Sequence, residues 1–315
     1  MAIFLTEEDV HHLLPMAEAI EAVEQGFKEH GSGTAVNLHR SRVQAGDTGI
    51  TMMVAALGDK KVAGFKVMGA GGAQVHLYDG EKNQLVAVLE ARNLGQIRTG
   101  AASAVAARYM SRPDAATVGL VGTGRQAETQ LEGICAVRPI KQALAYSRTP
   151  EHLEAFCVKM SQALGIQVTA AVSPKEAVQE SDIAVAITNV RTLEPVLLGE
   201  WVAPGTHLVG AGANSIGRRE LDDEAVARCS VIVTDARDQA KLECADLALP
   251  IEKGLWDWDK VWELGQVVIG QIQGRTSADD ITLYESQGIA LEDIAVATHI
   301  YQRAMAEGIG KTLPF

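Results

Sequence analysis

The sequence predicts an α/β protein, in which a doubly wound parallel sheet is joined to a second domain of α+β type. Two observations carry this prediction. Short extended runs separated by turns dominate the first third of the chain, whereas apolar strands alternate with helices beyond residue 113. Such alternation, with strands that are apolar along their length, is typical of a parallel sheet covered by helices on both faces. A Ser-Arg-Pro-Asp break at 111–114 separates the two patterns and marks a predicted domain boundary.

The first segment opens with helices and continues into strands. Thr6 precedes three acidic residues, as a helix N-cap residue does, and apolar residues recur along a second predicted helix at 16–29. An alanine-rich helix closes the segment and ends near Met110. Between these helices, extended runs predict strands at 36–44, 49–57, 62–68, 73–79 and 84–90. The segment is therefore predicted to contain an antiparallel or mixed sheet.

The second segment alternates strand and helix. The predicted strands lie at 117–122, 142–147, 167–172, 182–188, 207–212 and 230–235. The predicted helices lie at 125–137, 150–164, 174–180 and 220–229, and a last helix at 291–307.

The composition excludes several partners. The 315 residues include 28 Lys and Arg against 40 Asp and Glu, which gives a net charge of −12 and a pI near 5.2. Proteins that bind nucleic acid or anionic membranes need an excess of basic residues on one face, so we expect neither partner. The N-terminus lacks the pattern of a secretory signal, and no apolar run reaches the roughly 18 residues of a membrane span. Four dispersed cysteines predict reduced thiols, so we expect a cytoplasmic protein, and no metal-ligand spacing is found.

A glycine-rich loop follows the first strand of the second segment. The loop consists of Gly122, Thr123, Gly124, Arg125 and Gln126, and with Ala127 it fits the pattern G-x-G-x-x-A. The strand before it and the helix after it are the context in which this pattern binds the pyrophosphate of a dinucleotide. The alternative is a tight strand–helix turn without a ligand.

The end of the second strand bears on the choice between NAD and NADP. An acidic residue there would bind the ribose hydroxyl of NAD, but this chain has Ser147, Arg148 and Thr149. A guanidinium beside two hydroxyls suits a phosphate, so NADP(H) is favoured. In the alternative, Arg148 stacks on adenine and NAD(H) is used. We count Thr188, the last residue of the run 182–188, among the cofactor-binding residues.

Basic residues stand out in the first segment of this acidic protein. Strand alternation predicts Arg40 and Arg42 on one face, and Lys66 lies opposite two apolar neighbours. Arg98 lies near the predicted start of the alanine-rich helix, where a helix N-terminus and a guanidinium together would bind a carboxylate. Each of these cations has a plainer explanation as a solvated surface residue or a structural ion pair.

Five motifs together resemble the ornithine cyclodeaminase/mu-crystallin family over nearly the whole chain. These are GFK (64–66), LGQIRTGAASAVAA (94–107), GTGRQA (122–127), VGAGANSIGRREL (209–221) and DITLYESQGIALED (280–293). The resemblance implies a homodimer. It also implies a substrate and dimerisation domain at 1–112, completed by 291–315, and a Rossmann domain at 113–290, with the active site in the cleft between them.

The resemblance also implies an activity. Family members act on small α-amino or α-imino acids with a nicotinamide cofactor, and the family's substrate-carboxylate cations fall on Arg40, Lys66 and Arg98. We predict an NAD(P)H-dependent reductase of a small α-imino acid, such as pyrroline-2-carboxylate or an imino-dicarboxylate. Lys66 would polarise or protonate the imine, and Asn214 would hydrogen-bond the substrate or a water molecule.

Three alternatives stay open. A cyclodeaminase would convert ornithine to proline and ammonia, but the family's two acidic positions for this reaction are matched here by Thr51 and Asn214. An amino acid dehydrogenase of the alanine dehydrogenase type and a non-catalytic NADPH-binding protein are the other two.

Overall fold

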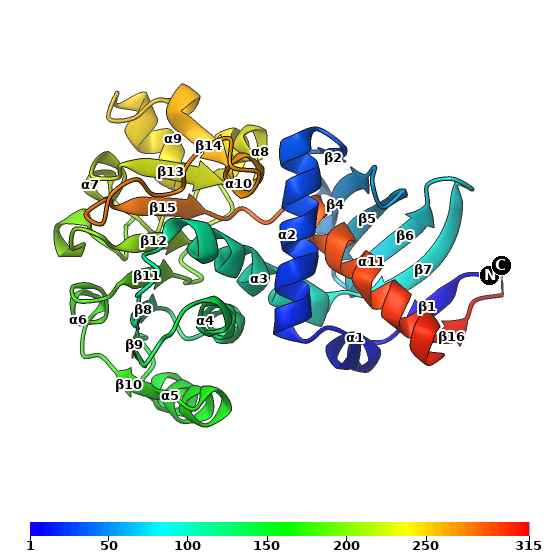
Figure 1. The fold of residues 1–315 in the computed structure, drawn as a ribbon, viewed down its shortest axis with the longest axis horizontal. Coiled ribbons are helices and arrows are strands. Elements are labelled where there is room, and N and C mark those ends of the chain that lie inside the picture. Colours follow the sequence, from blue (N-terminus) through cyan, green and yellow to red (C-terminus); the bar gives the residue numbers. More distant parts are fainter. Residues whose placement is uncertain (315) are drawn as a thin grey trace. The chain divides into compact units, whose positions relative to one another are not determined.

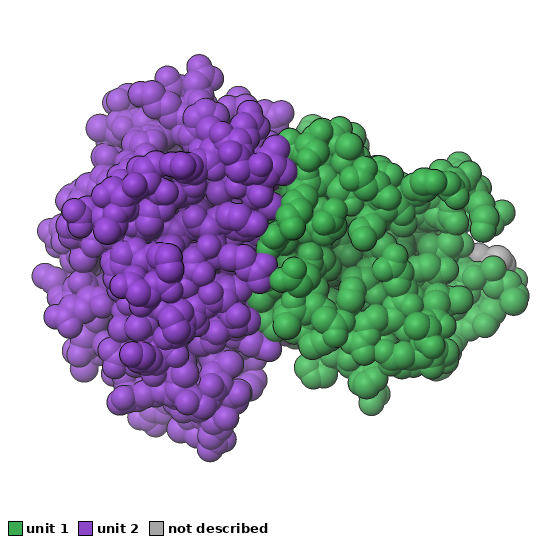
Figure 2. All heavy atoms as spheres, viewed as in Figure 1, with its two compact units in different colours: residues 1–102, 288–315 green, residues 103–287 purple. Residues whose placement is uncertain are grey.

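The computed structural model describes residues 1–314, which form two compact units (Figure 1, Figure 2). Unit 1 comprises Met1–Ala102 and the C-terminal segment that begins at Gly288, and unit 2 comprises Ser103–Gln287. The division falls inside helix α3 (Arg92–Met110), whereas the predicted boundary lies after this helix. Pro113 ends the helix locally, but the packing of each half of α3 determines the unit to which that half belongs.

Unit 1 is an α+β unit built on one mixed sheet with the strand order β16-β1-β7-β6-β5-β4-β2, and β3 pairs with β4 outside this path. Strands β4 to β7 are antiparallel neighbours, and β1 is parallel to β7. The strands are β1 (Ile3–Leu5), β2 (Ala35–Asn37), β3 (Ser41–Ala45), β4 (Thr48–Leu57), β5 (Val62–Gly69), β6 (Gly72–Asp79), β7 (Gln84–Glu90) and β16 (Lys311–Thr312).

Helices α1 (Glu7–Leu13), α2 (Met16–Ser32) and α11 (Ala290–Glu307) complete unit 1 with the first half of α3. Thr6 caps α1 as predicted, because its Oγ1 accepts a hydrogen bond from the backbone N–H of Asp9. Helix α11 packs against α2 and against strand β4, and Figure 1 shows the two helices side by side. The chain therefore returns to unit 1 at its C-terminal end.

The predicted strand at 36–44 is divided in two, which corrects the expected position of Arg40. Four residue steps separate Asn37 from Ser41, but three steps separate their partners on β4, Ala55 and Met52. The extra residue makes a bulge and resets the alternation of side chains. Arg40 is consequently buried, whereas Arg42 is exposed, and the prediction that both lie on one face is wrong.

Unit 2 contains the predicted doubly wound sheet, in which all eight strands are parallel in the order β10-β9-β8-β11-β12-β15-β13-β14. The order reverses between β8 and β11, and ligands of such sheets bind at that crevice. The strands are β8 (Thr117–Val121), β9 (Gln142–Tyr146), β10 (Gln167–Ala170), β11 (Ile183–Ala186), β12 (His207–Gly210), β13 (Val231–Thr234), β14 (Val261–Glu263) and β15 (Thr282–Glu285).

The helices of unit 2 lie between these strands. They are α4 (Arg125–Val137), α5 (Pro150–Leu164), α6 (Pro174–Val178), α7 (Asp223–Ala227), α8 (Arg237–Glu243), α9 (Ala245–Glu252), α10 (Leu264–Val268) and the 3₁₀ helices η1 (Gly199–Trp201) and η2 (Trp258–Lys260). Strand β15 was not predicted, because Thr282 and Glu285 are polar although every residue of the strand is buried. The elements from α8 to α10 also escaped prediction, since each is short.

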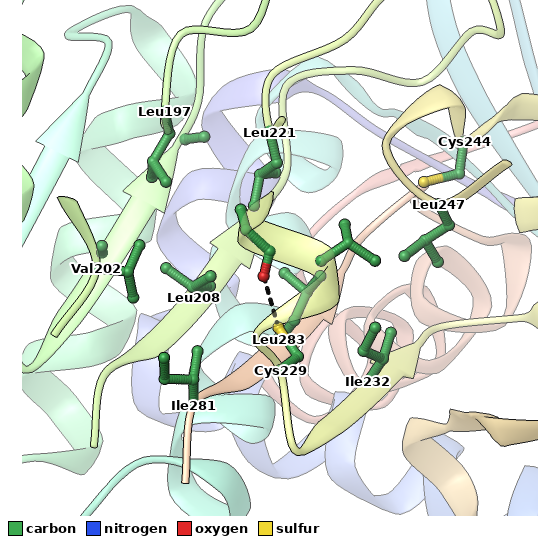
Figure 3. Close-up of a cluster of buried hydrophobic side chains, with 14 of the residues drawn as sticks. Leu197, Val202, Leu208, Leu221, Cys229, Ile232, Cys244, Leu247, Ile281 and Leu283 are labelled. Atoms are coloured by element: carbon green, nitrogen blue, oxygen red, sulfur yellow. Dashed lines mark hydrogen bonds between the residues drawn. The ribbon is translucent and has the colours of Figure 1, made fainter. Parts of the chain in front are cut away.

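The core of unit 2 is packed with leucine, isoleucine and valine side chains. Figure 3 shows Leu197, Leu208, Leu221 and Leu283 packed with Cys229, whose Sγ donates to the backbone oxygen of Ala225 at 3.1 Å. Burial raises the pKa of the Cys229 thiol, so this cysteine is an inert part of the core. All four cysteines are free thiols, as predicted. Among residues 1–314, no helix combines the length and the apolar character that a membrane span requires.

Candidate active site

A cavity of about 720 Å³ opens in unit 2 beside the reversal of strand order. Its lining comes from the loops that follow β8, β9, β11 and β12, where the carboxyl ends of the parallel strands meet. The structure brings every predicted cofactor residue to this one cavity, together with Asn214: Gly122, Thr123, Gly124, Arg125, Gln126, Ser147, Arg148, Thr149 and Thr188.

The glycine loop leaves room for a ligand at the start of helix α4. Gly122 has a φ of 114°, and a Cβ there would lie 2.3 Å from the oxygen of Ile187, so this glycine is required by the turn itself. Gly124 differs, because a Cβ at this position would meet no atom within 4 Å. Gly124 is the N-cap residue of α4 and has no side chain to cap the helix, so an anion can approach the N-terminus of α4 closely. The loop thus fits the pyrophosphate of a dinucleotide.

The charge of the cavity also fits a polyanion. Its lining contains Arg125, Arg148 and Arg218 and, among the described residues, no aspartate or glutamate. Arg148 is exposed in the loop after β9, and Thr149 is the N-cap residue of α5. The acidic side chain that would bind the ribose of NAD is therefore replaced by a guanidinium at this edge.

Glu220 was not predicted as a site residue, and its carboxylate connects two of the loops that line the cavity. One carboxylate oxygen accepts the backbone N–H and the hydroxyl of Thr188, both at 2.5 Å, and the other accepts the N–H of Gly212 at 2.6 Å. The hydroxyl of Thr188 is therefore used within the protein. The signal available in the sequence was an acidic residue shortly after a glycine-rich turn, but its partner Thr188 comes from a different loop, which follows β11.

Glu220 belongs to a group of buried carboxyls in unit 2. Asp246 Oδ1 accepts the backbone N–H groups of Glu220 and Leu221 at 2.8 and 2.7 Å. Oxygens of Asp246 and Glu285 lie within 4.8 Å of each other and of Cys244 Sγ. Burial, together with the neighbouring carboxyl of Glu220, raises the pKa of Asp246 to about 7, and burial raises the pKa of Glu285 well above its usual range. These raised pKa values favour the neutral, protonated form of both carboxyls.

Unit 1 contains the three predicted substrate cations, and the structure buries all of them. Lys66, Arg98 and Arg40 are 3%, 7% and 9% exposed. Lys66 lies on β5, Arg98 on α3, and Arg40 in the bulge between β2 and β3. Asn214, the other predicted catalytic residue, lies in unit 2 with the cofactor residues.

Two carboxylates of helix α11 face these cations. Asp293 Oδ1 accepts from Lys66 Nζ at 2.9 Å and from Arg98 Nε at 3.0 Å. Glu292 Oε2 accepts from Arg98 Nη1 at 2.6 Å, and Arg40 Nη2 donates to the backbone oxygen of Gly288 at 2.7 Å. Neither carboxylate was predicted, because two acidic residues in the first turn of a helix are also typical of a solvated N-terminus. Only the packing of α11 in unit 1 shows their role.

The position of Lys66 depends on a glycine of α3. A Cβ at Gly95 would lie 2.7 Å from Lys66 Nζ, so any other residue would displace the ammonium group. Burial lowers the pKa of Lys66, and so do the charges of Arg98 and Arg40, while Asp293 opposes this change.

The environment of Arg98 differs from the one expected. Helix α3 begins at Arg92, so Arg98 lies in its second turn rather than beside its first N–H groups. Those of Arg92 and Asn93 donate to the carboxylate of Glu7 at 2.6 and 2.7 Å. The N-terminus of α3 is therefore occupied by the side chain of Glu7. Of the two groups expected to bind a substrate carboxylate here, only the buried guanidinium of Arg98 keeps this proposed role.

The parallel sheet and its glycine loop define a Rossmann-type dinucleotide-binding protein. The chain belongs to the ornithine cyclodeaminase/mu-crystallin family, whose model matches residues 1–308. The family predicted from the five sequence motifs is thereby confirmed.

Three solved structures resemble this chain over nearly its whole length. The first is Δ1-pyrroline-2-carboxylate reductase of Thermococcus litoralis in complex with NADH and L-proline, with 32% identity, a TM-score of 0.92 and coverage of 99% of this chain and 100% of that one. The second is the iminosuccinate reductase of Paracoccus denitrificans in complex with NAD⁺, with 27% identity, a TM-score of 0.93 and coverage of 100% and 99%. The third is an archaeal alanine dehydrogenase dimer with bound NAD, with 31% identity, a TM-score of 0.91 and coverage of 100% and 99%.

The names of these similar proteins agree with the predicted type of reaction. Two of them are reductases of imino acids, the class predicted for this chain, and all three structures contain a nicotinamide cofactor. The predicted enzyme class, an oxidoreductase acting on C–N bonds, and the predicted type of cofactor are confirmed at this level.

Proposed function

We propose that this protein reduces a small α-imino acid to the corresponding amino acid with NAD(P)H. The observation that carries the proposal is the buried charge of unit 1. Three cations, Arg40, Lys66 and Arg98, face two carboxylates, Asp293 and Glu292. Buried guanidinium groups form strong, charge-assisted hydrogen bonds with carboxylates, so these cations suit the carboxylate of a substrate.

In this proposal each unit has its own task. The substrate domain, proposed at 1–112 with 291–315, holds the carboxylate through Arg40 and Arg98. The Rossmann domain, proposed at 113–290, holds the dinucleotide through the glycine loop. When bound, the reduced nicotinamide supplies a hydride to the imino carbon. The reacting atoms must approach to about 3–3.5 Å, so positioning by these residues accounts for much of the catalysis.

Lys66 is the proposed proton donor. A buried ammonium group with a lowered pKa gives up its proton more readily than an exposed lysine does. Asn214 would orient the substrate or a water molecule from the cofactor side. The absence of a carboxylate at Thr51 and Asn214 disfavours ornithine cyclisation, which must manage an amine and released ammonia.

A panel of substrates tests this function. Purified protein is incubated with NADPH or NADH and with pyrroline-2-carboxylate, with an imino-dicarboxylate, or with pyruvate and ammonia. Consumption of the reduced cofactor with a cyclic or acyclic imino acid supports the proposal, and turnover confined to pyruvate with ammonia would indicate an alanine dehydrogenase. Conversion of ornithine to proline without imino acid reduction would contradict it, as would tight NADPH binding without any turnover.

NADP(H) is the proposed cofactor, with NAD(H) as the alternative. Three arginines and the absence of acidic residues in the described lining of the cavity support this choice. Arg148→Ala should weaken NADPH binding by about tenfold or more, since a charge-assisted contact with the 2′-phosphate is lost. Isothermal titration of both cofactors measures this, with NADH as the internal control. Equal weakening of NADH and NADPH would rule out the phosphate contact.

A homodimer and a cytoplasmic location complete the proposal. Strands β3 and β4 expose Val43, Ile50 and Met52, and apolar side chains clustered on one sheet are typical of an interface. The archaeal alanine dehydrogenase with a similar fold is a dimer. Light scattering should give twice the chain mass of 33.5 kDa, and Ile50→Asp should give the monomer.

The four free thiols suit a reducing compartment, which cell fractionation tests.

A further inference from the structure

The carboxylate of Asp293 joins two of the substrate cations. The same oxygen, Oδ1, accepts from Lys66 Nζ at 2.9 Å and from Arg98 Nε at 3.0 Å. The side chains of Lys66 and Asp293 are 4% and 0% exposed, so bulk water does not screen the pair. The Lys66 ammonium is therefore held at one position by a single anion.

The remaining charges around Lys66 act against its protonation. Arg98 on α3 and Arg40 in the bulge before β3 both lower the pKa of Lys66 in addition to burial. Asp293 is the anion whose charge opposes them, while the neighbouring Glu292 is bonded to Arg98. Without Asp293, a buried lysine beside two guanidinium groups would lose its proton at a lower pH.

We propose that Asp293 is a positioning residue for imine reduction, which fixes the Lys66 ammonium and keeps it charged until the substrate nitrogen takes its proton. This role rests on the proposed function. One N–H bond of Lys66 breaks and an N–H bond forms on the imino nitrogen, while the hydride of NAD(P)H forms the C–H bond with the π electrons moving to nitrogen. Lys66 is left neutral beside Asp293 and regains a proton from water when the product leaves.

The dependence of kcat on pH tests the role of Asp293. Activity that needs protonated Lys66 falls as the pH rises through its pKa, which gives an alkaline limb. Asp293→Asn removes the opposing anion, so this limb should move to lower pH by about one unit or more. Titration of the substrate itself is the same for every variant and does not contribute to the difference.

Glu292→Gln is the matched control, because this neighbouring glutamate binds Arg98 and not Lys66. We expect its alkaline limb to stay in place. If Asp293→Asn lowers kcat equally at every pH, or if Glu292→Gln moves the limb by as much, Asp293 has a structural role alone and the inference is wrong.

Asp293→Glu provides a second test of the role of Asp293 if the Asp293→Asn variant does not fold. It retains the charge but lengthens the side chain, so kcat should fall while the alkaline limb stays within about half a unit of the wild-type position. A limb that moves by a full unit would contradict the inference. A wild-type protein that reduces no imino acid would instead refute the proposed function itself.

Discussion

Each unit of this protein buries a group of ionisable side chains. The two groups differ in how the free-energy cost of burying a charge is reduced. In unit 1, Lys66, Arg98 and Arg40 lie beside Asp293 and Glu292, so opposite charges pair. In unit 2, Glu220, Asp246 and Glu285 lie together, and the effect of Arg219 on Asp246 is smaller than that of burial and of Glu220. In the first group ion pairs offset the burial, whereas in the second group burial raises the pKa of the carboxyls and so favours their neutral form.

This electrostatic difference between the two groups agrees with the role of each group in its unit. Charges that persist in a buried site can bind an anion and move a proton, which the proposed chemistry of unit 1 requires. A buried carboxyl accepts hydrogen bonds in either protonation state, and Glu220 accepts them from Thr188 and Gly212 and so connects their loops. Substitutions that remove a charge should therefore have unequal effects in the two units.

The largest effect is expected from the removal of the cation that is proposed to donate the proton. Lys66→Met should lower kcat for imino acid reduction by about 10²–10⁴-fold, the range for loss of a general acid. Steady-state kinetics measure this effect, and the remaining activity should lack the alkaline limb. Lys82→Met, at an exposed lysine of the same unit, is the control and should retain the wild-type rate. Unchanged turnover in Lys66→Met would remove Lys66 from the mechanism.

The same substitution in the two groups should separate ion pairing from protonation. Glu292→Gln should lower the free energy of unfolding by about 3 kcal/mol, because it leaves Arg98 buried with one anion fewer. Glu285→Gln should cost less than about 1 kcal/mol, because burial raises the pKa of this carboxyl and so favours the neutral form that glutamine resembles. Denaturant titration measures both variants. Equal costs would show that the two groups are not different in the way described.

The smallest effect concerns the dependence of stability on pH. The pKa of Asp246 is raised from the ordinary 3.8 to about 7 in the folded protein. Between these values the folded protein binds a proton that the unfolded chain has lost, so this contribution to stability decreases as the pH rises. Wild-type protein should therefore lose roughly 2 kcal/mol more stability than Asp246→Asn between about pH 5.5 and about pH 8.

Thermal unfolding of both proteins across this range provides the measurement. Buried His207, whose pKa is lowered to about 3, is the same in both proteins and cancels in the comparison. If stability depends on pH in the same way for the wild type and for Asp246→Asn, Asp246 is ionised in the folded state.

Much of the fold could be predicted because its signals are local. Strand β8, the turn at Gly122 and helix α4 follow one another, so the glycine loop was recognisable without knowledge of the rest of the chain. The prediction of Lys66 and Arg98 as substrate cations also rested on short motifs. Arg40 was predicted as a strand residue, but the bulge that buries it depends on the register with β4, which the sequence of the strand does not show.

The sequence by itself determined the family, the doubly wound sheet and the loop at residues 122–126, since neighbouring residues specify these features. Only the tertiary structure decided which anions face the cations. Lys66 and Asp293 lie 227 positions apart, and Thr188 and Glu220 lie 32 apart. An acidic residue has the same local pattern whether it is solvated, paired with a cation or protonated in a core. The surroundings that distinguish these states are provided by distant segments that meet only in the folded chain.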